Sequence, residues 1–322
     1  MKWRDEFLRL NGAGEMLVYS AADFEDFRVP RPDMPPNMEA DLEAVVGLLA
    51  RNKWAFRLHA TYDQTISRAL NVFEKVNREV PISGLRWFFD HCETISDRNI
   101  ERIKALGGGI AIQHRMAFQG ESFIERYGKQ AAESTPPTRR MLAMGVPVGV
   151  GTDATRVASY NPWTSLSWLV TGQTVGGTAL YPETNLVSRA DALRLFTVGS
   201  AWFSREEDRK GQIAPGQLAD LAVLSEDYFT VAPERIRGIE SLLTVLGGRV
   251  VHATGAFTPH APPPVPLLPE WSPVAKFGGH WRMSAGAALP PQPIVCPHGF
   301  DHAPLGRDAL SHPGGGCSCW AF

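Results

Sequence analysis

Four side chains that can bind a metal ion or move a proton follow short apolar runs of the sequence. They are His59, His91, His114 and Asp153. Imidazole and carboxylate groups are ligands of Zn²⁺, which keeps one coordination position open for water when three protein groups hold it. The metal lowers the pKa of that water to about 7, and a nearby carboxylate such as Asp153 can accept the proton. Two imidazoles and this carboxylate therefore favour a hydrolytic site for Zn²⁺ or another divalent transition metal.

Each of these residues also has an ordinary structural explanation. A single histidine at the end of a strand is more often a hydrogen-bonded structural residue than a ligand, and Asp153 could form an Asx turn in the GTDA segment. Cys92 and His91 could form a nucleophile pair, although neighbours on a strand point to opposite faces. No GxSxG, Walker A or GxGxxG motif stands between a strand and a helix. Because three histidines and an aspartate stand at equivalent positions, the metal-site interpretation is favoured.

Apolar periodicity predicts alternating helices and strands between about residues 39 and 204. The predicted helices span 39–52, 65–80, 96–107 and 188–204. The predicted strands span 53–60, 85–92, 108–115 and 146–154. The four polar residues stand at the C-terminal edges of these strands, where the active sites of (β/α)8 barrels form. The sequence thus predicts an α/β fold with a parallel sheet that belongs to a TIM barrel.

The sequence pattern changes after about residue 209. The segments 210–229 and 241–257 contain short apolar runs separated by glycine turns, which predicts a small β element. The Pro- and Gly-rich segment 258–322 is expected to be an irregular tail. Three of the four cysteines lie in this tail near histidines, and they could bind a metal of their own.

Composition and charge exclude several classes of partner. The chain of 322 residues has a formal net charge of -2 and no Lys/Arg run, which argues against a nucleic-acid partner. No stretch approaches the roughly 20 apolar residues that span a bilayer, and the charged N-terminus lacks the apolar core of a secretory signal. We therefore expect a soluble, cytoplasmic protein that acts on a small molecule, with no nucleic-acid or membrane partner.

Four segments carry a resemblance to a known family, namely LHATYD, FDHCETIS, GVPVGVGTDAT and KGQIAPGQLADLAVLS. Over about residues 10–257 the sequence resembles the amidohydrolase superfamily, in particular its amidohydrolase 3 branch of metal-dependent hydrolases. The resemblance implies a TIM barrel followed by a small β-sandwich. It also implies that His59 is the metal ligand of barrel strand 5, His91 that of strand 6, and Asp153 the strand 8 aspartate that binds metal and acts as general base.

The sequence departs from the family pattern in its first part. Family members carry a His-x-His pair on strand 1, whereas this chain has no such pair and no histidine before His59. Residues 9–15, RLNGAGE, resemble the strand 4 region, but the lysine that bridges two metals in many relatives is not evident and Glu15 is a weak substitute. We therefore expect the C-terminal part of a barrel, about strands 4 to 8, in an N-terminally truncated chain. A homo-oligomer or a partner that supplies the missing strands is expected with it.

The predicted function is hydrolysis of an amide-type C–N bond by metal-activated water. We expect His114, Arg115 and Arg156 to contact the substrate, because they stand at or just after the C-terminal ends of predicted strands. The predicted domains are a partial barrel at 1–209, a β-sandwich-type segment at 210–257 and the tail. The main alternative is a non-catalytic half-barrel that pairs with a partner chain. A sugar- or nucleotide-binding α/β protein without metal is a further alternative.

Overall fold

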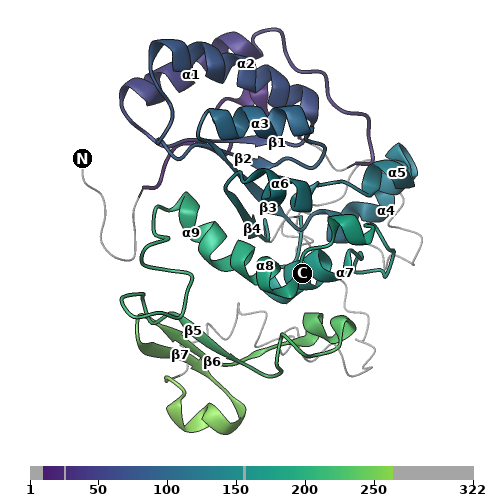
Figure 1. The fold of residues 1–322 in the computed structure, drawn as a ribbon, viewed down its shortest axis with the longest axis vertical. Coiled ribbons are helices and arrows are strands. Elements are labelled where there is room, and N and C mark those ends of the chain that lie inside the picture. The colour runs from purple at the N-terminus through teal and green to yellow at the C-terminus, as the bar shows by residue number, and fades with distance from the viewer. Residues whose placement is uncertain (1–9, 25–26, 155–156, 264–322) are drawn as a thin grey trace, which may run out of the picture. The chain divides into compact units, whose positions relative to one another are not determined.

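The computed structural model describes residues 10–24, 27–154 and 157–263. The main sheet has four parallel strands in the order β1-β2-β3-β4 (Figure 1). They are β1 (Arg57–Ala60), β2 (Phe88–His91), β3 (Gly109–Gln113) and β4 (Val148–Gly151). Neighbouring parallel strands need long crossover connections, and amphipathic helices supply them here. The predicted α/β fold with a parallel sheet is confirmed.

The helices between the strands follow the predicted apolar periodicity. The described α-helices are α1 (Met38–Arg51), α2 (Asp63–Glu79), α3 (Asp97–Ala105), α4 (Met116–Tyr127), α5 (Lys129–Ala132), α6 (Thr138–Met144), α7 (Pro162–Thr171), α8 (Arg189–Arg194) and α9 (Ser200–Phe203). Short 3-10 turns are η1 (Tyr19–Ala21), η2 (Glu183–Asn185), η4 (Pro233–Gly238) and η5 (Gly255–His260). The first three predicted helices correspond to α1, α2 and α3. The helix predicted at 188–204 is interrupted by the π-helical turn η3 (Leu195–Gly199), which separates α8 from α9.

Capping side chains set the starts of two helices where the sequence predicted them. The Ser96 hydroxyl accepts a hydrogen bond from the backbone N–H of Asn99 at the start of α3. At the start of α8 the Ser188 hydroxyl accepts from the backbone N–H of Asp191 at 3.1 Å. Such bonds satisfy N–H groups that have no partner inside the helix. The helix starts therefore depend on local sequence and not on tertiary packing alone.

A short extended segment pairs with the outer edge of β1. The Ala13 N–H donates to the Ala55 carbonyl at 3.0 Å, and the Arg57 N–H donates to the Ala13 carbonyl at 2.8 Å. The His59 N–H then donates to the Glu15 carbonyl at 3.2 Å. Gly14 allows this close approach, because a Cβ there would lie 2.2 Å from the Arg57 carbonyl oxygen and its φ is +119°. The pairing brings the Glu15 side chain to the end of β1 that carries His59.

The two faces of the main sheet differ in polarity. One face places Leu58, Phe89 and Ile110 fully in the core, and Phe89 stacks on Phe73 of α2 with ring centroids 5.4 Å apart. Figure 1 shows α1, α2 and α3 on one side of this sheet. Side chains alternate along a strand, so Arg57, His59 and Asp90 point to the other face. The apolar face anchors the strands, and the other face is free to carry polar side chains.

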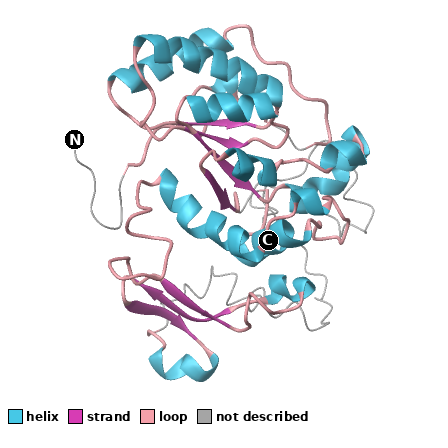
Figure 2. Ribbon diagram, viewed as in Figure 1, coloured by secondary structure: helices cyan, strands magenta, loops and turns pink. Residues whose placement is uncertain are grey.

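A second, antiparallel sheet follows along the chain in the order β5-β6-β7. Figure 2 shows its strands in magenta. Its strands are β5 (Leu221–Leu224), β6 (Ser241–Leu246) and β7 (Arg249–Ala253). The predicted small β element is therefore present, while the domain boundaries at 209 and 257 stay predictions. The predicted tail at 258–322 lies outside the described residues from residue 264 onward. In the described part of the chain, no helix has the length and apolar character that a membrane crossing needs.

Candidate metal centre

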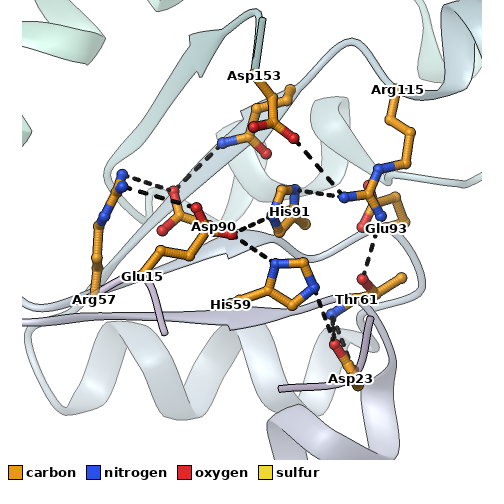
Figure 3. A network of polar contacts seen from close by, with 11 residues as sticks. Glu15, Asp23, Arg57, His59, Thr61, Asp90, His91, Glu93, Arg115 and Asp153 are labelled. Atoms are coloured by element: carbon orange, nitrogen blue, oxygen red, sulfur yellow. Dashed lines mark hydrogen bonds and ion pairs between the residues drawn. The ribbon is translucent and has the colours of Figure 1, made fainter. Parts of the chain in front are cut away.

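Three side chains meet at the C-terminal edge of the main sheet. Glu15, His59 and His91 place one possible ligand atom each within 4.8 Å of the others. Glu15 Oε1 lies 2.6 Å from His59 Nδ1 and 3.0 Å from His91 Nε2 (Figure 3). The register of the sheet explains the meeting, because Ala60 of β1 pairs with His91 of β2, and β1 also pairs with the segment that carries Glu15. The two imidazoles thus come from the adjacent strands β1 and β2, and the carboxylate comes from the segment that pairs with the other edge of β1.

The protonation of this group suits metal binding. Burial lowers the pKa of His91 to about 3, so its imidazole is neutral at pH 7. Burial raises the pKa of Glu15, but hydrogen bonds from His59 and His91 outweigh it and hold the pKa well below its usual range. Glu15 is therefore ionised. Metal ions bind carboxylates and neutral imidazoles in these same protonation states.

The donor set and its exposure also fit a divalent transition metal. Two imidazole nitrogens and one carboxylate oxygen are donors that Zn²⁺ accepts, and three protein ligands leave a position for water. His59 and His91 are buried, whereas 23% of the Glu15 side chain is exposed. One side of the group is therefore open to solvent or substrate.

Asp153 lies just beyond β4, near the group of three but not in it. Its Oδ2 is 3.9 Å from Arg115 Nη2, and Arg115 Nη2 is 3.3 Å from His91 Nδ1. Burial raises the pKa of the Asp153 carboxyl, and the nearby Arg115 partly offsets this. The backbone of Asp153 has φ +53° and that of His91 has φ +81°. Non-glycine residues rarely adopt this region, and functional sites are where such strain concentrates. The metal and general-base roles of Asp153 stay predictions.

Arg115 is buried beside His91 and contacts several residues of the site. Its Nε lies 3.6 Å from Glu93 Oε1, and both side chains are almost fully buried. Burial raises the pKa of Glu93, and the Arg115 guanidinium opposes this rise. Arg115 thus connects Glu93 with His91 and Asp153. Its predicted contact with substrate stays a prediction.

The other two predicted substrate residues lie in different situations. His114 is fully buried, and its Nδ1 is hydrogen-bonded to the Ser165 hydroxyl of α7. Burial lowers the pKa of His114 to about 4. Its Nε2 has no hydrogen-bond partner among the described residues. Arg156 lies outside the described residues, so its predicted role stays a prediction.

Sequence reasoning missed the three buried carboxylates that surround the two histidines and Arg115, namely Asp23, Asp90 and Glu93. Asp90 precedes His91 in β2, and burial raises its pKa to about 7 although Arg57 Nη1 lies 3.5 Å from its Oδ1. Asp23 is fully buried and lies 3.6 Å from His59 Nε2. Asp90 could have been found from its place beside His91 at a strand end. No sequence signal singles out Asp23, because its partners follow β1, more than thirty residues away.

The sequence matches a family model described as the amidohydrolase family over residues 2–252. It is 27% identical to the YtcJ protein of Bacillus subtilis (strain 168) over 199 residues, which cover 61% of this chain and 37% of that protein. It is also 27% identical to an N-substituted formamide deformylase of Arthrobacter pascens over 193 residues, which cover 59% of this chain and 35% of that enzyme. The chain thus spans little more than a third of the length of these relatives.

Two solved structures have a similar fold. An uncharacterized metal-dependent hydrolase from Pyrococcus furiosus aligns with a TM-score of 0.52 and 23% identity, over 67% of this chain and 44% of that one. A second, from Pyrococcus horikoshii OT3, aligns with a TM-score of 0.51 and 22% identity, over 61% of this chain and 39% of that one. At these identities the likeness bears on the fold alone. It supports a TIM-barrel architecture for the parallel sheet.

Proposed function

Because this chain belongs to the amidohydrolase family, we propose that it carries the metal centre of a hydrolase that cleaves an amide-type C–N bond with activated water. The observation that carries the proposal is the meeting of Glu15, His59 and His91 around one point at the C-terminal edge of a parallel sheet. In (β/α)8 enzymes this edge is the catalytic one. The chemistry of the three donors suits Zn²⁺ or another divalent transition metal.

The residues around this point would divide the work of hydrolysis. A divalent metal held by Glu15, His59 and His91 would lower the pKa of a bound water to about 7. Asp153 would take the proton from the attacking water and deliver it to the leaving nitrogen. The Arg115 guanidinium, 3.9 Å from Asp153 Oδ2, would orient this carboxylate and favour its ionised form before it accepts the proton.

The bond and substrate class are proposed from two sources. One relative is an N-substituted formamide deformylase, which favours an N-acyl or N-formyl amine of small size as the substrate here. The ring of Phe24 lies beside that of His59, with centroids 5.3 Å apart, and Tyr19 lies 5.8 Å from Phe24. Both rings are exposed, so they would offer an apolar contact beside the metal. His114, Arg115 and Arg156 stay proposed polar contacts of the substrate, although the structure buries the His114 and Arg115 side chains.

We also propose that the main sheet is the part of a TIM barrel from strand 4 to strand 8. The paired segment at residues 13–15 would be strand 4, and β1 to β4 would be strands 5 to 8. A closed barrel of this type needs eight strands. A homo-oligomer, or a partner chain that packs against this sheet, is part of the proposal.

An activity assay with a matched pair of variants tests this function. The chain, loaded with Zn²⁺ or Co²⁺, is incubated with N-formyl and N-acetyl amines and with the corresponding esters, and the released amine is measured. It is assayed alone and together with a separately produced fragment that carries barrel strands 1 to 3 of a relative. We expect amine release that needs metal and is lost in His91→Gln and Asp153→Asn. Metal binding without turnover in either preparation would contradict the hydrolase and would favour a non-catalytic half-barrel.

A further inference from the structure

Asp23 is a fully buried carboxylate to which neither the sequence analysis nor the proposed hydrolysis gives a role. Its Oδ1 accepts a hydrogen bond from the Thr61 N–H at 2.8 Å, and its Oδ2 accepts from the Tyr62 N–H at 2.9 Å. Thr61 and Tyr62 directly follow β1, the strand that carries His59. The two backbone donors fix the position of the carboxylate at the end of that strand.

The remaining side of this carboxylate faces the His59 ring. Asp23 Oδ1 lies 3.6 Å from His59 Nε2, and Figure 3 shows Asp23 and Glu15 at opposite ends of the imidazole. The Nε2 atom is buried and has no hydrogen-bond partner within the described part of the chain. The other ring nitrogen, Nδ1, contacts Glu15 Oε1 at 2.6 Å. A buried nitrogen without a hydrogen-bond partner lowers the stability of the fold. The Asp23 carboxylate is a possible acceptor whose distance from this nitrogen is less than an ångström longer than a hydrogen bond.

We propose that Asp23 is a positioning residue of the metal centre, which accepts the Nε2 proton of His59 when Nδ1 binds the metal. While Nδ1 donates to Glu15, Nε2 is without a proton and needs no acceptor. A metal on Nδ1 requires that atom to be deprotonated, so the single ring proton must then be on Nε2. Histidine ligands nearly always donate their second N–H to a carboxylate, a carbonyl or water, which fixes the ring orientation. The inference rests on the proposed metal centre.

The surroundings of His91 show why this support is specific to His59. The second nitrogen of His91, Nδ1, faces the Arg115 guanidinium at 3.3 Å. A guanidinium can donate a hydrogen bond but cannot accept one. Among the two imidazoles, only His59 therefore has a carboxylate behind it. The loss of Asp23 would not be replaced by another acceptor from the described contacts of the ring.

The variant Asp23→Asn tests the role of the carboxylate. Its amide oxygen must stay near the N–H groups of Thr61 and Tyr62, so the amide nitrogen turns toward His59 Nε2. Two donors then face each other if Nε2 carries a proton. We expect the Kd for Zn²⁺ to rise by about 10- to 100-fold, the usual effect of losing such a partner. The Kd is measured by competition with a chromophoric chelator.

Asp63→Asn is the matched control. Asp63 is a partly buried carboxylate that accepts from the Ser96 N–H and from the Asn99 side chain, each at 2.7 Å, and it contacts neither imidazole in the described hydrogen bonds. This variant should lower the Tm and leave the Kd for Zn²⁺ unchanged. Circular dichroism of both variants separates loss of folding from loss of metal.

A proton measurement on the unaltered chain completes the test. Long-range ¹H–¹⁵N spectra of the zinc-loaded chain should show the His59 Nε2 proton shifted downfield and slow to exchange, as expected for a bond to a buried carboxylate. A rapidly exchanging Nε2 proton in the zinc-loaded chain, or an Asp23→Asn variant with unchanged Kd, would overturn the inference while leaving the metal centre intact. If the unaltered chain bound no Zn²⁺, the proposed function itself would fail, and the two failures are thereby distinguished.

Discussion

The effect of pH on the stability of the fold can show whether His114 is a buried structural histidine or an exposed one that binds substrate. The imidazole is fully buried, and burial lowers its pKa from 6.5 to about 4. In the unfolded chain the ring takes up a proton below about pH 6.5, whereas in the folded chain it stays neutral until about pH 4. The unfolded state then binds more protons, so the free energy of unfolding falls as the pH falls.

The size of the effect follows from the two pKa values. Relative to its value above pH 7, the contribution of His114 to the free energy of unfolding falls by about 1.4 kcal/mol at pH 5.5 and by about 2.5 kcal/mol at pH 4.5. His114→Gln removes this titration, and the amide can still bond to the Ser165 hydroxyl. The two proteins should therefore differ in the slope of stability against pH, in addition to any constant offset.

Urea unfolding followed by tryptophan fluorescence at several pH values between 7.5 and 4.5 measures this difference. Other groups that titrate in this range are the same in both proteins, so their effects cancel when one curve is subtracted from the other. The difference curve should change by about 2.5 kcal/mol over the range. A flat difference curve would refute the reasoning and would place His114 in an exposed, substrate-facing position.

Three further predictions concern the catalytic carboxylate, the strand that carries Glu15 and a helix start. In an active preparation, Asp153→Asn should lower kcat by about 10² to 10⁴, with an unchanged circular dichroism spectrum because Asn tolerates φ +53°. A kcat within tenfold of the original would remove Asp153 from the mechanism. Gly14→Ala should lower both the Tm and the zinc affinity, whereas Gly151→Ala should change neither, since a Cβ there meets nothing within 4 Å. Equal effects of the two would show that the close approach at Gly14 is unimportant. Ser96→Ala should lower the free energy of unfolding by about 1 kcal/mol in urea titrations, and no change would mean that the cap of α3 contributes nothing.

Much of the fold could be predicted because its signals are local. Apolar residues with helical spacing mark α1 to α3, and β-branched and aromatic runs mark the strands, so burial of one face fixes both element type and approximate bounds. The π-helical turn Leu195–Gly199 was not predicted. Nothing in the periodicity of that segment distinguishes it from a continuous helix.

The candidate site could be predicted only in part, for a physical reason. His59 and His91 lie at the C-terminal ends of β1 and β2, and the parallel pairing of these strands brings the two residues together. Their metal-ligand role stays a prediction. Glu15 was noticed only as a weak substitute for lysine, because its contact with His59 depends on the pairing of a three-residue segment with β1. Asp23 lies in a loop near His59, and this loop has no apolar periodicity from which its position could be predicted. Contacts of this kind depend on tertiary packing, which cannot be inferred from the spacing of residues along the sequence.

Zinc binding by the unaltered chain and by His91→Gln is the measurement that tests the central claim most directly. Equilibrium titration with Zn²⁺, checked by elemental analysis, should show saturable binding at one site, with no more than one equivalent per chain. X-ray absorption of the loaded site should show imidazole ligands and a carboxylate. The variant should lose this binding and keep its circular dichroism spectrum, because Glu15, His59 and His91 form the group together. Undiminished zinc binding by folded His91→Gln, or two tightly held zinc ions per chain, would contradict the account.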